Sequence, residues 1–194
     1  MDENELTQRF YKTFEALMPI LQDIYKGFFA NNTALLKECS SKFQKMHTTV
    51  LPFVEKIISE KEKDPIEKKY VALLLSFQPV ALAIDNLINR MLDKVQNNIL
   101  FGDKAVKEIK TLLDITYGQC RDSKDYFLTK NPHLRHNVVM AKEKLMELVI
   151  EFDIVHQNRL ITGVCMPKAS YLYIDFTHSL KRISKGLADL VEKD

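Results

Sequence analysis

Apolar side chains recur at spacings of three and four residues along most of this 194-residue chain. Such spacing gathers them on one side of an α-helix and leaves polar side chains on the other. Two clear stripes lie toward the C-terminus and consist of Leu145, Leu148, Val149, Phe152, Val155 and Leu160, and of Leu172, Phe176, Leu180, Ile183, Leu187 and Leu190. The pattern predicts long amphipathic helices, with Phe176 in the core.

Residues that favour tight turns are scarce. The chain has five glycines and six prolines, and it contains no Asn-Gly or Asp-Gly step. A β-sandwich or β-barrel needs a turn about every 8–12 residues, usually built on such steps. The composition therefore excludes an all-β fold, and together with the helical stripes it predicts an all-α fold.

Short polar breaks divide the chain into long helical segments. Asp64 and Asn131 each precede a proline, which is the pattern of an N-cap followed by proline at the first helical position. Pro19, Pro52 and Pro79 fall inside the first three segments and are expected to kink or split them. The short links make neighbouring helices antiparallel. The predicted helices are 4–30, 33–62, 65–98, 103–129, 132–162 and 167–192.

The two halves of the chain resemble each other weakly. A shift of 98 positions pairs residues of similar type, among them Phe29 with Phe127 and Leu36 with Leu134. The paired positions follow the order of the predicted helices. We therefore expect a single domain over 1–194, made of two three-helix pseudo-repeats at 1–100 and 101–194.

Charge and cysteine content restrict the partners and the compartment. The net charge is +2, whereas nucleic-acid-binding domains usually show a basic stripe, so no nucleic-acid partner is expected. Three cysteines without a C-x-x-C motif indicate a reducing compartment. The start, MDENELTQRF, lacks the apolar segment of a signal peptide. The longest apolar stretch, Val71 to Ile84, has about 14 residues, and a membrane span needs about 20. We expect a cytoplasmic chain that does not insert into a membrane.

Familiar catalytic motifs are absent from the sequence. There is no G-x-S-x-G, no Walker loop and no G-x-G-x-x-G. The chain is therefore predicted to be non-enzymatic.

One pattern points to metal chemistry. Asp153 and His156 are three residues apart, as are Asp175 and His178, and residues at this spacing point the same way on a helix. Di-iron helical bundles use carboxylate and histidine pairs of this kind. His178, however, falls beside the apolar stripe, and partner glutamates on other helices are not evident. Solvated flanks are therefore the favoured interpretation, and a helical-bundle metalloprotein or oxidase is the alternative.

A cluster of cations lies inside the last predicted helix. Lys181 and Lys185 share one helix face, and Arg182 lies beside them. Like charges four residues apart are mildly unfavourable unless an acidic group faces them. The cluster is either a solvated face or a contact for an anion or an acidic partner.

The C-terminal third resembles the PhoU-like family, and most of all the cytosolic PhoU-related domains of bacterial sodium/phosphate cotransporters. The resemblance rests on HQNRLITGVC at 156–165, on Pro167, and on DFTHSLKRISKGLADL at 175–190. In that family a helix ending in a His-x-x-Arg-Leu-like segment turns at a small-residue loop. The helix that follows has counterparts of Leu180, Arg182, Ile183 and Leu190. The resemblance implies two tandem three-helix bundles and a role in phosphate transport or phosphate-starvation signalling.

One departure from the family concerns metal. Its members can carry a Glu-x-x-x-Asp motif in the third helix of each repeat, and these motifs bind multinuclear iron clusters. Here the second motif has Lys181 and Lys185, and the first has Ala81 and Asp85. One acid in four positions cannot neutralise and ligate a ferric cluster. We therefore expect no cofactor, and Asp85 is at most a weak ligand candidate.

The resemblance also implies a type of partner. It favours a regulatory or accessory domain that contacts a phosphate transporter or a sensor kinase, and a homodimer is compatible with it. Such a domain would lie at the inner face of the membrane, through a partner or through an N-terminal membrane domain. A helical scaffold unrelated to phosphate remains a further alternative.

Overall fold

Six long helices make up the protein, in a computed structural model that describes residues 2–59 and 63–194, except the side chains of 50–54, 56 and 57. No strand occurs among the described residues. The all-α prediction is confirmed. The helices are α1 (Glu3–Ala30), α2 (Thr33–Ser59), α3 (Pro65–Gln96), α4 (Asp103–Thr129), α5 (Pro132–Ile161) and α6 (Pro167–Lys193).

The helix boundaries agree closely with those expected from the sequence. Asp64 caps α3 through a capping box with Glu67, and the Asn131 side chain accepts a hydrogen bond from the backbone N–H of His133 at the start of α5. Both predicted N-caps are therefore confirmed. The predicted end of the second helix, at 62, lies outside the described residues.

The internal prolines do not divide their helices. α1 runs continuously through Pro19 and α3 through Pro79, so of the expected kink or split the split does not occur in either helix. Each proline removes one backbone hydrogen bond. Buried residues lie on both sides of each proline, Leu17 and Ile20 around Pro19 and Phe77 and Val80 around Pro79. This apolar burial offsets the loss. Pro52 lies within α2, but its side chain is outside the described set.

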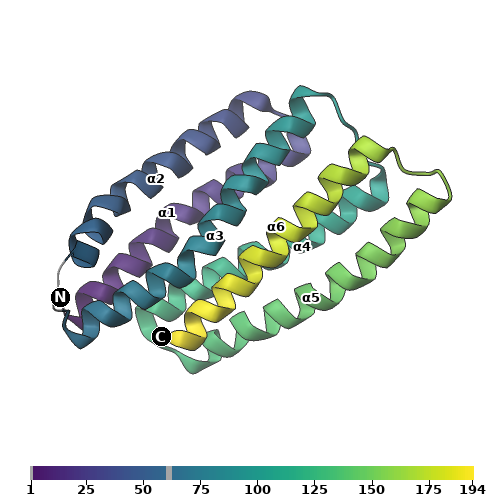
Figure 1. Ribbon diagram of the computed structural model, residues 1–194. Coiled ribbons are helices and arrows are strands. Elements are labelled where there is room, and N and C mark those ends of the chain that lie inside the picture. The colour runs from purple at the N-terminus through teal and green to yellow at the C-terminus, as the bar shows by residue number, and fades with distance from the viewer. Residues whose placement is uncertain (1, 60–62) are drawn as a thin grey trace.

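The helices form two three-helix units. α1, α2 and α3 contact one another, and so do α4, α5 and α6. The units meet where α3 packs against α6 and α1 packs against α4. Figure 1 shows α2 and α5 at opposite edges of the bundle, with the other four helices between them. This is the arrangement of two tandem three-helix bundles expected from the resemblance.

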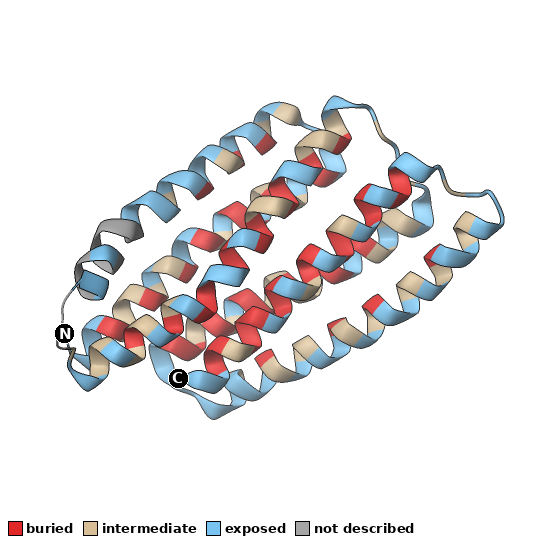
Figure 2. Ribbon diagram, in the orientation of Figure 1, coloured by how far each residue is buried: buried red, intermediate tan, exposed pale blue. Residues whose placement is uncertain are grey.

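Aromatic side chains fill the core between the two units. The Phe10 and Phe14 rings of α1 stack on the Phe127 ring of α4, with centroids 5.0 and 5.5 Å away. Farther along the bundle, Phe176 of α6 meets Phe28 of α1 edge-on at 5.9 Å. Phe176 is fully buried, as predicted. Figure 2 shows buried positions concentrated on the inward sides of the four central helices.

α3 is the most apolar helix of the bundle. The mean hydropathy of its most apolar 18-residue segment is 1.8. By length and composition α3 is therefore long and apolar enough to cross a membrane. In this structure 39% of that segment is buried inside the protein. Of the apolar side chains that are not buried, Leu75 and Leu82 are exposed on the surface, and others, such as Val71 and Leu74, pack partly buried against the core.

Candidate functional site

α3 and α6 lie side by side and run antiparallel, and three contacts define their register. Asn86 Nδ2 donates to Ser179 Oγ at 2.8 Å. Toward one end Arg90 pairs with Asp175 at 2.8 Å, and toward the other Lys193 Nζ donates to Ser76 Oγ at 2.8 Å. Positions on the two helices therefore face each other when their residue numbers sum to about 265–269.

The outward side of α3 is apolar. Leu75, Pro79 and Leu82 follow one another at spacings of four and three residues, so they share one helix face. The leucine residues are 60% and 64% exposed, respectively. Single exposed leucines are common on protein surfaces, but a row of them beside a groove is a typical feature of interaction sites.

The outward side of α6 is cationic. Arg182 and Lys185 are exposed and Lys181 is half-buried. Lys185 pairs with Asp189 on its own helix at 2.6 Å. Within the described part of the chain, Lys181 and Arg182 make no ion pair or hydrogen bond through their side chains. The cation cluster predicted from the sequence is therefore an open surface, with two charges left unneutralised.

A groove of about 470 Å³ separates the apolar row of α3 from the cations of α6. Its α3 wall includes Leu75, Ser76 and Pro79, and its α6 wall includes Arg182, Lys185 and Lys193. We call this surface, with the neighbouring Leu82 added, the α3–α6 face. Its side chains can bind an oxyanion or a carboxylate on the α6 side and an apolar group on the α3 side.

A second polar feature is buried where α4, α5 and α6 meet. Arg159 of α5 makes a bidentate pair with Glu108 of α4, at 2.8 and 2.7 Å. The hydroxyl of Tyr173 on α6 donates to Glu108 Oε2 at 2.6 Å. His156 stacks on the Tyr173 ring, with centroids 4.3 Å apart, and its Nε2 lies 2.6 Å from Ser170 Oγ. We call these five residues the buried polar cluster.

Burial sets the protonation states of this cluster. It lowers the pKa of His156, and the adjacent Arg159 lowers it further. It also raises the pKa of Tyr173, as does the hydrogen bond to Glu108. The pKa of Arg159 is raised by its pairing with Glu108. The cluster thus holds a neutral imidazole and a protonated phenol around one charged pair, which joins three helices.

The hydrogen bond between Ser170 and His156 resembles the serine–histidine contact of a serine hydrolase. In a catalytic triad a carboxylate accepts from Nδ1 and stabilises the imidazolium. Here the Arg159 guanidinium lies 3.4 Å from Nδ1, where its charge disfavours the imidazolium. Ser170 and His156 are also only 5% and 2% exposed. The pair is arranged to hold α5 against α6 and has the wrong electrostatics for general-base catalysis.

The residues of the two Asp-x-x-His pairs point to different places. His156 belongs to the buried polar cluster, and Asp153 is half-buried one turn earlier on α5. Asp175 pairs with Arg90 of α3, and His178 is exposed. Among the described residues, no three His, Cys, Asp or Glu side chains come together as a metal site. The structure therefore does not assemble the ligand set that the alternative interpretation requires.

The family's iron-cluster positions can be tested in the same way. Ala81 is buried and offers no ligand. Asp85 accepts hydrogen bonds from Gln44 of α2 and from Asn89, both at 3.1 Å. At the matching positions of α6, Lys181 and Lys185 present ammonium groups. These residues do not fit a multinuclear iron cluster, which needs several converging carboxylates.

Sequence reasoning missed most of the buried polar cluster. Glu108 is 51 positions from Arg159 and 65 from Tyr173, so no local motif links them. The only signal was the spacing of three residues between His156 and Arg159 and between Ser170 and Tyr173, which puts each pair on one helix face.

Comparison with known proteins supports the fold. No family model matches the chain, and no curated protein matches it in sequence. In structure it is similar to the crystal structure of PhoU from Pseudomonas aeruginosa, with a TM-score of 0.80 and 10% sequence identity. The match covers 98% of this chain and 94% of that one. The protein therefore has a PhoU-like fold over 98% of the chain.

Proposed function

We propose that this protein is a non-enzymatic regulatory or accessory domain in phosphate transport or phosphate-starvation signalling, and that it acts by contact with another protein. The observation that carries the proposal is the PhoU-like fold over 98% of the chain. The fold by itself does not define a function. The resemblance of 156–165 and 175–190 to PhoU-like sequences supplies the phosphate context.

The character of the surface supports a contact role. The α3–α6 face leaves Arg182 without a side-chain partner among the described residues, beside an exposed apolar row. A domain of this kind changes the state of its partner by binding one state more tightly than another. The proposed partner is a phosphate transporter or a sensor kinase, and the proposed location is the cytoplasm, at the inner face of the membrane.

A non-enzymatic role agrees with the chemistry available in the helices. The Ser170–His156 pair is buried next to a guanidinium instead of a carboxylate. Cys39 and Cys120 are buried, and burial raises the pKa of each thiol to about 12. Neither thiol is therefore a thiolate nucleophile near neutral pH.

Gene deletion tests the proposal. The deletion strain is compared with wild type for phosphate uptake and for a phosphate-responsive reporter, at high and at low external phosphate. We expect the phosphate concentration at which the reporter switches to shift, and the wild-type gene to restore it. A complementing gene with Lys181→Glu, Arg182→Glu and Lys185→Glu should fail to restore it at equal protein level. Unchanged uptake and reporter response in the deletion strain would refute the phosphate role and favour an unrelated scaffold.

A further inference from the structure

We infer that the α3–α6 face is a docking groove for an acidic amphipathic helix of a partner protein, with apolar residues along one flank and Asp or Glu along the other. This inference rests on the proposed function, in that both require action by protein contact. It goes further by assigning the surface, the type of element that binds there, and the orientation of its two flanks.

The apolar wall of the groove matches the pitch of a helix. Leu75 and Leu82 are seven residues apart on α3, which is about 10.5 Å at 1.5 Å per residue. A helix lying parallel to α3 presents its own apolar residues at the same interval, at positions i, i+3 or i+4, and i+7. Pro79 lies between the leucines and adds a flat apolar surface. The wall can therefore bury a row of partner side chains about two turns long.

The cationic wall lies level with the apolar wall. The register of α3 and α6 places Leu82 opposite positions 183–187 and Pro79 opposite positions 186–190, so Arg182 and Lys185 flank the same stretch of the groove. Asp189 is the one acid in this wall, and it pairs with Lys185. Arg182 makes no ion pair within the described part of the chain and remains available to a partner's carboxylates. Charge complementarity therefore requires an acidic flank on the side of α6.

The shape of the face favours a helix over other anionic partners. Leucines and cations lie side by side on two helices, with a groove of about 470 Å³ between them. A third helix fits such a groove by ridges-into-grooves packing. A bilayer surface is flat and would meet only the rims of the groove. The net charge of +2 is also small for a surface that tracks a nucleic-acid backbone.

Two synthetic peptides test this inference with the full chain. Both are 21-residue helices with leucines at the same heptad positions. One carries Glu at the flanking positions and the other carries Lys. Binding is measured by fluorescence anisotropy at 50 and 500 mM NaCl. We expect the Glu peptide to bind about tenfold more tightly at low salt, because two or three exposed ion pairs of modest strength together give that factor.

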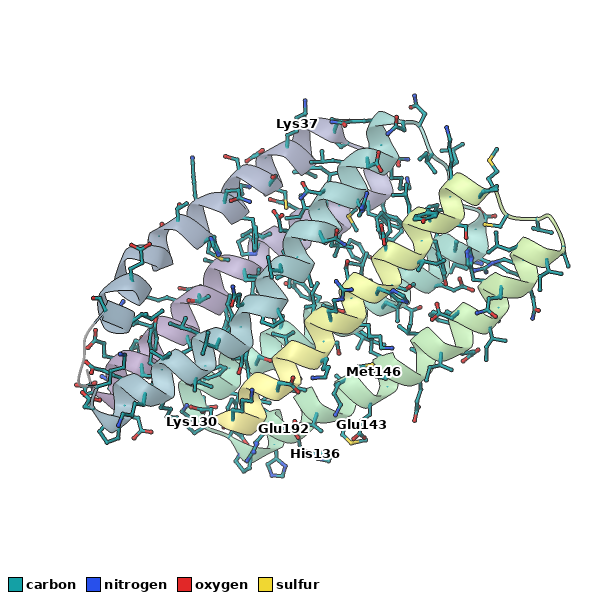
Figure 3. All side chains as sticks on the ribbon, in the orientation of Figure 1. Lys37, Lys130, His136, Glu143, Met146 and Glu192 are labelled. Carbon is teal, nitrogen blue, oxygen red and sulfur yellow. The ribbon has the colours of Figure 1, made fainter. Side chains whose placement is uncertain are left out.

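Variants of each wall separate the two components of binding. Arg182→Glu/Lys185→Glu should reverse the preference and favour the Lys peptide. Leu75→Ser/Leu82→Ser should weaken the Glu peptide without reversing the preference. Lys37→Glu/Lys144→Glu is the matched control, since it makes the same charge change at exposed lysines of α2 and α5, and it should change nothing. Lys37 lies at the far edge of the bundle, on α2 (Figure 3). All these side chains are exposed, and circular dichroism checks that each variant is folded.

Three outcomes would overturn the inference. The first is equal binding of the two peptides, or no binding of either. The second is a dimer in sedimentation velocity that Arg182→Glu/Lys185→Glu dissociates, which would make a second copy the occupant. The third is binding to vesicles containing phosphatidylserine without binding to the Glu peptide, which would make a membrane surface the occupant. A phosphate phenotype in the deletion strain would leave the proposed function intact in all three cases.

Discussion

α3 and α6 occupy matching places, since each is the third helix of its unit and each packs on the other. Their buried sides are alike in chemistry, with Ile84 and Leu87 on one and Phe176 and Leu180 on the other. Their exposed sides differ, because α3 presents leucines where α6 presents cations. The comparison shows that the two helices share an apolar buried side, while their exposed residues give each helix a different surface chemistry.

The two helices also differ in how they bury polar groups. Lys94 of α3 is 4% exposed, donates to Asn31 Oδ1 at 2.5 Å and lies over the Phe28 ring. Burial lowers the pKa of Lys94. On α6, Tyr173 joins a cluster with a complete charged pair. α3 thus buries one cation, Lys94, whose hydrogen-bond partner is neutral. α6 instead packs against the Glu108–Arg159 ion pair, in which the two charges neutralise each other.

The largest expected effect tests the shared buried side. Phe176 is fully buried, and its ring centroid lies 5.9 Å from that of Phe28 and 5.5 Å from that of Phe101. Phe176→Ala should lower the free energy of unfolding by about 3–5 kcal/mol, because it removes buried apolar surface and leaves a cavity. Urea denaturation measures this. A loss below about 1 kcal/mol would mean that α6 does not bury this face.

The next largest effect concerns the Glu108–Arg159 ion pair that Tyr173 of α6 contacts. Arg159→Met removes the cation that pairs with Glu108, and it leaves a carboxylate that is only 12% exposed. We expect a loss of about 2–4 kcal/mol in the free energy of unfolding, because breaking a largely buried pair strands the remaining charge. Arg121→Met, which breaks the exposed pair with Asp122, is the matched control and should cost about 0.5 kcal/mol or less. Equal effects of the two substitutions would show that the buried cluster adds nothing specific.

A smaller effect sharpens the contact between α3 and α6. A Cβ at Gly186 would lie 2.3 Å from Val80 Cγ2 of α3, so the two helices approach each other closely there. Gly186→Ala should cost about 1–2 kcal/mol, since overpacking outweighs the gain of about 1 kcal/mol in helix propensity. In a Val80→Ala background the same substitution should be neutral or stabilising. Additive effects of the two substitutions would argue against direct contact.

The smallest effect is a pH dependence at His156. The folded-state pKa of His156 lies below its ordinary value of 6.5, so the folded protein binds fewer protons than the unfolded chain below about pH 6.5. Stability from this group is therefore present at neutral pH and is lost as pH falls through 6.5 toward the lowered pKa. The stability difference between wild type and His156→Gln should narrow from pH 7.5 to 5.5 in urea denaturation. A difference that stays constant or widens would contradict the assignment of a buried, neutral imidazole.

Local sequence signals were sufficient for much of this fold. Asp64 and Asn131 marked helix starts, and the spacing of apolar residues correctly placed Phe176 in the core. The cations of α6 were also visible, as like charges four residues apart on one helix face. Each of these features depends on residues within one or two helical turns.

Contacts between distant helices were beyond the same reasoning. Gln119 is 1% exposed, and its Nε2 donates to the carbonyls of Val138 and Ser184 on two other helices. Pairing Glu108 with Arg159, or Lys94 with Asn31, likewise depends on how each helix is rotated and shifted against its neighbours. Periodicity defines the buried side of a helix, but it does not set the register between helices.

Metal content tests most directly the claim that the α6 surface serves acidic groups instead of cations. The protein is purified without a metal-affinity tag, and iron, nickel and zinc are measured by elemental analysis. We predict less than about 0.1 equivalent per chain, because Lys181 and Lys185 repel cations where a cluster would need carboxylates. Lys181→Glu/Lys185→Asp should raise the metal affinity. One or more equivalents of metal bound to the wild-type protein, and lost on substitution of Asp85, would contradict the account. Loss of bound metal on substitution of His156 or Asp175 would instead favour the Asp-x-x-His alternative.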